Sequence, residues 1–123
     1  MTNDIVALID FYEREKQIDR EKVINALQYA FVSAYRKNVR GSDKIETLRA
    51  QIEPKKGDIT MFATLTVVAD EDHVDQWNEV PLTLARKLKP EAELEDTVEM
   101  NVTPKNFGRI AVQTAKQLSL IHI

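Results

Sequence analysis

The change of period at Thr103-Pro104 is the feature that most restricts how this chain can fold. Before it, Val98, Met100 and Val102 alternate with polar residues, which is the period of a half-buried strand. After it, apolar and small residues recur at steps of three and four, the spacing of one helix face: Phe107, Ile110, Ala111, Thr114, Ala115 and Leu118. The sequence therefore predicts a strand that leads directly into an amphipathic helix within residues 104–118.

The outer face of this predicted helix is positive. Arg109, Gln113 and Lys116 fall at i, i+4 and i+7, so we expect them to form a stripe opposite the buried face. The whole chain has a net charge of −3, yet no Asp or Glu occurs in residues 100–123. The negative net charge argues against a domain that grips nucleic acid with its whole surface, and the positive surface is local to this segment. From the pattern alone, a solvated helix face remains the alternative for the stripe.

Length and composition indicate one ordinary globular domain. The chain has 123 residues and no cysteine, so disulfides and thiolate catalysis are excluded. No apolar run approaches the length of a membrane span. Asp4 and Asp10 interrupt the apolar N-terminal segment, which is therefore unlike a signal peptide. We expect a soluble, cytoplasmic monomer without a membrane partner.

Two helices are predicted before the first strand. The first begins with a cap at Thr2 or Asn3 and ends near Lys16, and the second has Asp19 as its N-cap. The second helix carries small residues on a broad apolar face, which would let another element approach closely. It ends in the basic residues Arg36, Lys37 and Arg40 before Gly41. Such residues are favourable partners of a helix C-terminus, and a binding role for Lys37 and a neighbour is the alternative.

Strands dominate the middle of the chain. Residues 48–53 and 59–67 alternate and are separated by a Pro-Gly turn, so we expect an antiparallel hairpin with a bend or bulge in its long second strand. A short edge strand and helix follow at 79–88, and the last strand covers 97–102. This order lacks regular crossover helices. It predicts an α+β fold, in which an antiparallel sheet packs with N-terminal helices and a C-terminal helix in a single domain.

The sequence offers little for catalysis or metal binding. The acidic loop at 70–75 lacks the glycine and the terminal glutamate of a calcium loop, so we expect a solvated turn there, anchored to the core by Trp77. The histidines are His73, in this loop, and His122, beside the chain end. The three glycines do not form a phosphate-binding loop. We therefore expect no enzyme activity, no metal site and no cofactor.

Three segments resemble one known family. Residues 106–117 read NFGRIAVQTAKQ, close to the family phrase NFGRIAAQTAKQ, with Val112 as the departure. Residues 19–27 resemble the opening of the family's second helix, and residues 79–85 resemble its EISLEEA-like segment. Over residues 1–118 the chain resembles the N-terminal domain of the bacterial transcription termination/antitermination factor NusA.

The resemblance implies a function for the positive stripe. In that family the domain docks on RNA polymerase, at the flexible flap of the β subunit over the RNA exit channel, and supports hairpin-dependent pausing and termination. Basic side chains approach the nascent RNA hairpin, and the matching positions are Lys37, Arg109 and Lys116. We expect Arg36 and Gln113 to contribute to the same RNA- or polymerase-contacting surface. A free-standing small RNA-binding protein is the alternative.

Two departures from the family pattern carry expectations of their own. The family has Gly-Asp before the last strand, whereas this chain has Glu95-Asp96, so we expect a turn conformation that does not need glycine. The family also continues the last helix as a long amphipathic segment. Here the chain reads LSLIHI from Leu118, and we expect residues 119–123 to be a truncated or non-native tail. Gly108 is expected to allow close backbone packing where the last helix begins.

Overall fold

The computed structural model describes residues 3–121, with side chains for residues 5–117. In chain order the elements are α1 (Asn3–Glu15), α2 (Arg20–Asn38), η1 (Ser42–Lys44), β1 (Leu48–Ile52), β2 (Ile59–Val68), η2 (Asp70–Asp72), β3 (Glu79–Pro81), α3 (Leu82–Leu88), β4 (Thr97–Asn101) and α4 (Phe107–Ile121). The predicted α+β class and the order of the main elements are confirmed.

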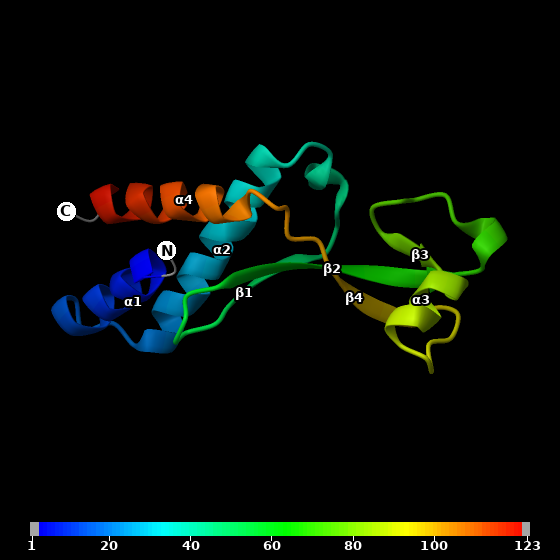
Figure 1. The fold of residues 1–123 in the computed structure, drawn as a ribbon, viewed down its shortest axis with the longest axis horizontal. Coiled ribbons are helices and arrows are strands. Elements are labelled where there is room, and N and C mark those ends of the chain that lie inside the picture. The colour runs from blue at the N-terminus through cyan, green and yellow to red at the C-terminus, as the bar shows by residue number, and fades with distance from the viewer. Residues whose placement is uncertain (1–2, 122–123) are drawn as a thin grey trace.

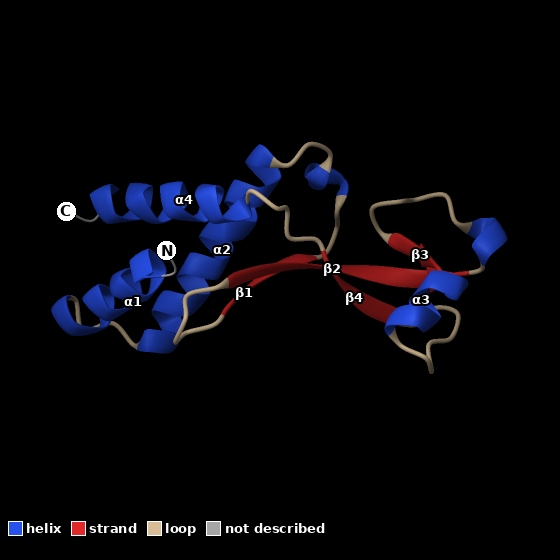
Figure 2. Cartoon of the chain, viewed as in Figure 1, coloured by secondary structure: helices blue, strands red, loops and turns tan. Residues whose placement is uncertain are grey.

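The elements divide between two ends of the molecule. Helices α1, α2 and α4 gather at one end, and β2 extends from them toward β3 and α3 at the other (Figure 1). The strands form the connection between the two ends (Figure 2). We call residues 69–96, which contain η2, β3 and α3, the distal lobe. One hydrophobic core runs through both ends, from Ile5 and Phe31 to Val80 and Ala92, as expected for a single domain.

Strand β2 is the centre of the sheet. It pairs antiparallel with β1, so that Leu48 lies opposite Ala63 and Ile52 lies opposite Ile59. It also pairs antiparallel with β4. These two pairings confirm the predicted hairpin and the predicted last strand. Of the predicted bend or bulge, the bulge is absent, because both ladders keep one register along β2.

The short strand β3 departs from the predicted antiparallel sheet. Its three residues pair with β2 in parallel, so the sheet is mixed. Thr66 pairs with Glu79 of β3 and with Thr97 of β4, which places these strands on opposite edges of β2. Since β1 and β4 also flank β2, β1 and β3 follow one another along the same edge. The long β2 thus changes partner along its length, which explains how a strand of 10 residues is accommodated without a bulge.

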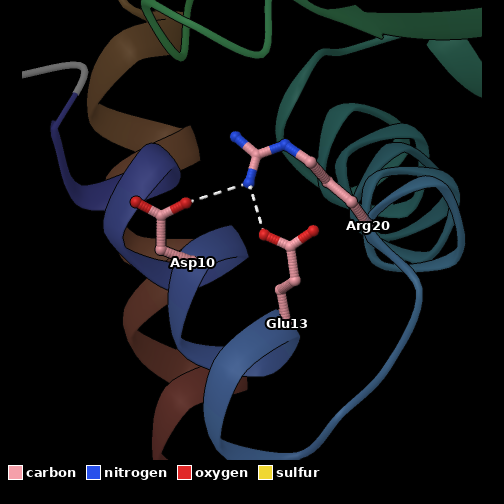
Figure 3. A network of polar contacts seen from close by, with 3 residues as sticks. All are labelled: Asp10, Glu13 and Arg20. Atoms are coloured by element: carbon pink, nitrogen blue, oxygen red, sulfur yellow. Dashed lines mark hydrogen bonds and ion pairs between the residues drawn. The ribbon is translucent and has the colours of Figure 1, made fainter.

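The joint between α1 and α2 is held by side chains from both helices. Asp19 precedes α2 as predicted, but its side chain makes no capping hydrogen bond. Instead, Arg20 Nη1 lies 2.9 Å from Asp10 Oδ1 and 3.2 Å from Glu13 Oε1, bridging the two helices (Figure 3). Gln17, in the connection, has a φ of 54°. Thr2, one of the two predicted cap residues of α1, lies outside the described residues.

The turn before β4 keeps a conformation that favours glycine. Glu95 has a φ of 72°, in the left-handed region, so the prediction of a turn without this requirement is wrong. Hydrogen bonds hold the turn in place: Glu95 N donates to Val67 O at 2.8 Å, and Glu93 N donates to Asp96 Oδ2 at 2.9 Å. The turn thus keeps a backbone conformation that suits glycine, and Glu95 adopts it with steric strain from its side chain.

Two further expectations concern close packing. Trp77 packs against the core as predicted, and a Cβ atom at Gly41 would lie 2.5 Å from its ring, so this glycine allows the close approach. At Gly108 the expectation is wrong, because a Cβ atom there would meet nothing within 4 Å. Helix α4 continues to Ile121, past the predicted domain boundary at residue 118. Residues 122–123 of the predicted tail lie outside the described residues.

Candidate nucleic-acid interface

The segment before α4 is tied to both the sheet and α2. Met61 N donates to Thr103 Oγ1 at 2.8 Å, and the Tyr35 hydroxyl donates to Val102 O at 3.0 Å. The rings of Tyr35 and Phe107 lie 5.9 Å apart. Burial raises the pKa of Tyr35, so its hydroxyl keeps its proton as a donor at neutral pH. These contacts fix where α4 begins relative to the C-terminal end of α2.

Helix α4 buries the predicted face and exposes the positive stripe. Phe107, Ile110, Ala111 and Ala115 are buried, Thr114 is half-buried, and the side chain of Leu118 lies outside the described residues. Burial of one phenylalanine alone contributes about 1.5–3 kcal/mol. On the other face, the three residues of the stripe are all exposed: Arg109, Gln113 and Lys116. Within residues 5–117, the ion pairs involve Arg20 and Arg49, and neither Arg109 nor Lys116 has an acidic partner. The stripe therefore presents uncompensated positive charge to solvent.

A groove between α2 and α4 brings Lys37 to this surface. Lys37 and Gln113 both line it, and its volume is about 420 Å³. Ala30 and Ala34 lie in its α2 wall, so the small side chains that predicted a close approach do face another helix. Among the described residues, Arg109 and Lys116 do not line the groove but lie on the exposed face of α4. Gln113 therefore belongs both to the stripe and to the groove that Lys37 lines.

Arg36 has a structural role in this arrangement. Its Nη1 donates to Ser42 O at 2.8 Å and to Ile45 O at 2.9 Å, which holds the loop after α2. The fully buried Ser42 hydroxyl in turn donates to Val39 O at 2.6 Å. The neighbouring Lys37 and Arg40 are exposed. Arg36 therefore positions the end of α2, where Lys37 lies, and its guanidinium is already engaged by carbonyl oxygens.

Four polar residues of the groove were not among the predicted site residues: Ser33, Asn38, Thr114 and Gln117. Thr114 was expected on the buried face of the helix. Ser33 and Lys37 are four residues apart on α2, as Gln113 and Gln117 are on α4. Helical spacing from the predicted residues would have found both. Asn38 Nδ2 donates to Ala34 O at 2.8 Å, a contact at the helix end that the sequence did not indicate.

The acidic loop is a largely exposed turn, as predicted, and its carboxylates also organise it. Hydrogen bonds from the Thr83 side chain and backbone lower the pKa of Asp70, and hydrogen bonds from Asn78 and Trp77 lower the pKa of Asp75. These contacts connect the loop to α3 and to the start of β3. Within the described part of the chain, no group of three or more His, Asp or Glu side chains is placed to hold a metal.

Across residues 3–121, no helix combines the length and the apolar character needed to cross a bilayer.

Comparisons with known proteins agree on one family. The family model described as the NusA N-terminal domain matches residues 4–123. The chain is 36% identical over 118 residues to the transcription termination/antitermination protein NusA of Bacillus subtilis, and equally to that of Halalkalibacterium halodurans, covering 96% of the chain and 30% of each relative. It is 33% identical over 116 residues to NusA of Rickettsia conorii, with coverage of 94% and 22%. The chain thus spans less than a third of these relatives.

The fold comparison gives the same result. The solution structure of the N-terminal domain of NusA from B. subtilis superimposes with a TM-score of 0.76 at 36% identity, covering 96% of this chain and 91% of that one. Sequence and fold therefore agree over nearly the whole chain. This chain belongs to the family of NusA N-terminal domains, from transcription termination/antitermination factors.

Proposed function

We propose that this chain is a cytoplasmic RNA polymerase-binding module that docks at the flap of the β subunit, near the RNA exit channel, and supports hairpin-dependent pausing. One observation carries the RNA-facing part of the proposal. Lys37 on α2 and Gln113 on α4 line the groove between these helices, the stripe of Arg109, Gln113 and Lys116 runs along the exposed face of α4, and residues 100–123 contain no Asp or Glu. We propose no catalytic role for the chain.

The chemistry of this surface fits a phosphate backbone. Lysine and arginine neutralise phosphates and release their counterions, and Gln113 adds an amide that both donates and accepts hydrogen bonds. The first turn of α4 contains no acidic residue, although acids are favoured at the positive end of a helix. An RNA phosphate near this end would supply the missing negative charge. Arg36 contributes by holding the end of α2 in position.

The polymerase-docking part of the proposal is tested directly by binding. The chain is titrated against bacterial RNA polymerase and against the same enzyme without its flap tip. We expect a large loss of affinity on removal of the flap tip. Equal affinity for the two enzymes would contradict docking at the flap.

The RNA-facing part is tested by reversing the charge of the stripe. We expect Arg109→Glu with Lys116→Glu, in a chain joined to the RNA-binding modules of a NusA relative, to reduce pause enhancement by about tenfold or more. Two charge-assisted contacts are lost, and each contributes about 1 kcal/mol or more. The measurement is pause lifetime at a hairpin-dependent site during transcription in vitro.

A matched control separates location from net charge. Lys55→Glu with Lys56→Glu reverses two exposed charges in the β1–β2 turn and changes the net charge equally. This control should enhance pausing by RNA polymerase as much as the parent does. Both variants should keep the parent's melting temperature within a few degrees. If the stripe variant enhances pausing as much as the parent does, the stripe is a solvated helix face.

A free-standing small RNA-binding protein is the second candidate, because an exposed positive stripe can bind RNA without polymerase. It predicts tight binding of an RNA hairpin by the isolated chain. The polymerase-binding module predicts weak binding, because few basic residues face the RNA. The salt dependence of RNA binding distinguishes the two.

A further inference from the structure

We propose that a hollow in the distal lobe binds a basic amphipathic segment of a protein partner, with one apolar side chain inserted as an anchor. The hollow has a volume of about 480 Å³ and lies between η2, α3 and the loop before β4. This proposal goes beyond the proposed function and does not depend on the positive stripe, because the two surfaces lie on different elements.

The hollow is lined by both apolar and acidic residues, together with Thr83 and Arg86. Ala69, Leu82 and Leu94 supply apolar lining, and Asp70 and Glu71 supply carboxylates. Leu94 is 52% exposed although it is a large apolar residue. An anchor side chain that covers Leu94 would remove this apolar surface from water, which is favourable.

The walls of the hollow are held by hydrogen bonds on both sides. Thr83 N donates to Asp70 Oδ1 at 3.1 Å, which ties η2 to α3. Arg86 Nε donates to Ala92 O at 3.1 Å, which ties the following loop to α3. The Arg86 guanidinium thereby belongs to the wall. The hollow is therefore formed before a ligand binds, which lowers the entropy cost of binding.

The charge of the distal lobe selects the kind of partner. Residues 69–96 contain nine acidic and three basic residues, a net charge of −6 with histidine neutral. The lobe also holds four of the seven exposed large apolar side chains in the described part of the chain: Val74, Leu84, Leu88 and Leu94. Apolar side chains on a strongly acidic surface are complementary to a helix with leucines on one face and lysines on the other. RNA would be repelled from this end of the molecule.

The test uses a designed amphipathic helix as the probe. A 16-residue peptide with leucines on one face and lysines on the other is titrated into the isotope-labelled chain, and amide shifts are followed by NMR. We expect shifts at residues 69–71, 82–86 and 94. A peptide with the same composition but dispersed leucines, and a peptide with glutamate in place of lysine, should bind at least tenfold more weakly.

Matched variants locate the anchor. Leu94→Ser should weaken peptide binding at least tenfold, whereas Leu88→Ser, at a leucine that is 51% exposed in the same lobe but does not line the hollow, should change it less than twofold. Likewise, Glu71→Gln should weaken binding at low salt, and Glu91→Gln, at a glutamate that does not line the hollow, should not. These side chains are exposed, so the variants should fold, which the NMR spectra verify.

Several outcomes would overturn the proposal. Equal effects of Leu94→Ser and Leu88→Ser would mean that the peptide adheres to apolar surface in general. Equal binding of the dispersed-leucine peptide, or amide shifts centred on α4, would also exclude the hollow as the site. Shifts at the hollow that depend on protein concentration without peptide would assign it to a second copy of the chain. None of these results would affect the flap and stripe experiments, so the two proposals can fail separately.

Discussion

At the scale of single residues, the most informative position is Glu95. It has a φ of 72°, and the amide hydrogen bonds on both of its sides show that the turn holds it there. An L-residue in the left-handed region costs about 1–2 kcal/mol, whereas glycine adopts it freely but loses more entropy on folding, by about 0.5–1 kcal/mol. The difference between these two costs decides the effect of a substitution.

We therefore expect Glu95→Gly to stabilise the fold by about 0.5–1 kcal/mol, which corresponds to a rise in melting temperature of about 2–6 °C. Thermal unfolding followed by circular dichroism measures it. Glu95→Gln is the control for charge and should leave the strain in place. Glu93→Gly, at a neighbour without a positive φ, should destabilise. A Glu95→Gly variant no more stable than the parent would show that the turn is not strained.

At the scale of elements, the sequence predicted those whose pattern is local. The alternation of β2 and the three-four spacing of α4 gave their buried faces correctly, because one face of each packs on the core. The parallel pairing of β3 was missed, since a strand of three residues carries no directional pattern and its partner is distant in sequence. The loop contacts of Arg36 were also missed, because they depend on how the chain folds back after α2.

The groove between α2 and α4 was likewise predicted only where a pattern within one helix indicates it. Spacing along α4 predicted that Gln113 and Lys116 share an exposed face. That Lys37 comes from α2 to the same groove was implied only by the family resemblance, since no periodicity within one helix indicates which residues of another lie opposite. The hollow of the distal lobe was not predicted either. Its walls come from η2, α3 and a loop, three segments that the chain brings together through two side-chain hydrogen bonds.

The loop between β2 and β3 gives a prediction about pH. The pKa values of Asp70 and Asp75 are lowered, mainly by hydrogen bonds from Thr83 and Asn78. A depressed pKa means that the stabilisation is fully present above the unfolded value, near 3.8, and is lost as pH falls through the lower folded value. We therefore expect Asp70→Asn with Asp75→Asn to be less stable than the parent at pH 7.

The difference in stability between this variant and the parent should shrink as pH falls from about 5 to below 3, where the parent's carboxylates also become protonated. Urea unfolding across this range measures it. Glu71→Gln with Asp72→Asn makes the same change of charge in the same loop and should follow the parent closely. A stability difference that stays constant with pH would mean that the carboxylate charge does not stabilise the loop.

At the scale of the whole molecule, charge is separated between the two ends. The distal lobe carries a net charge of −6, whereas residues 100–123 carry three basic residues and no acid. β2 leads from the helical end to the distal lobe, so the positive stripe and the acidic lobe lie at different ends (Figure 1). If RNA binds as proposed, this charge separation would orient it, because its phosphates would be attracted at α4 and repelled at the lobe.

This separation predicts the salt dependence of RNA binding by the isolated chain. The proposed RNA-facing surface has three basic side chains, Lys37, Arg109 and Lys116, and the exposed Lys105 just before α4 brings the number to four. Each neutralised phosphate contributes a slope of about −0.9 to the plot of log affinity against log salt, so the total should be no steeper than about −4. Fluorescence anisotropy of a labelled RNA hairpin at salt concentrations from about 50 to about 200 mM measures the slope. The Lys55→Glu with Lys56→Glu variant should keep it, and the Arg109→Glu with Lys116→Glu variant should make it shallower by about 2. A much steeper slope would require a larger basic surface than this chain places at α4, and it would favour the free-standing RNA-binding protein over the polymerase-bound module.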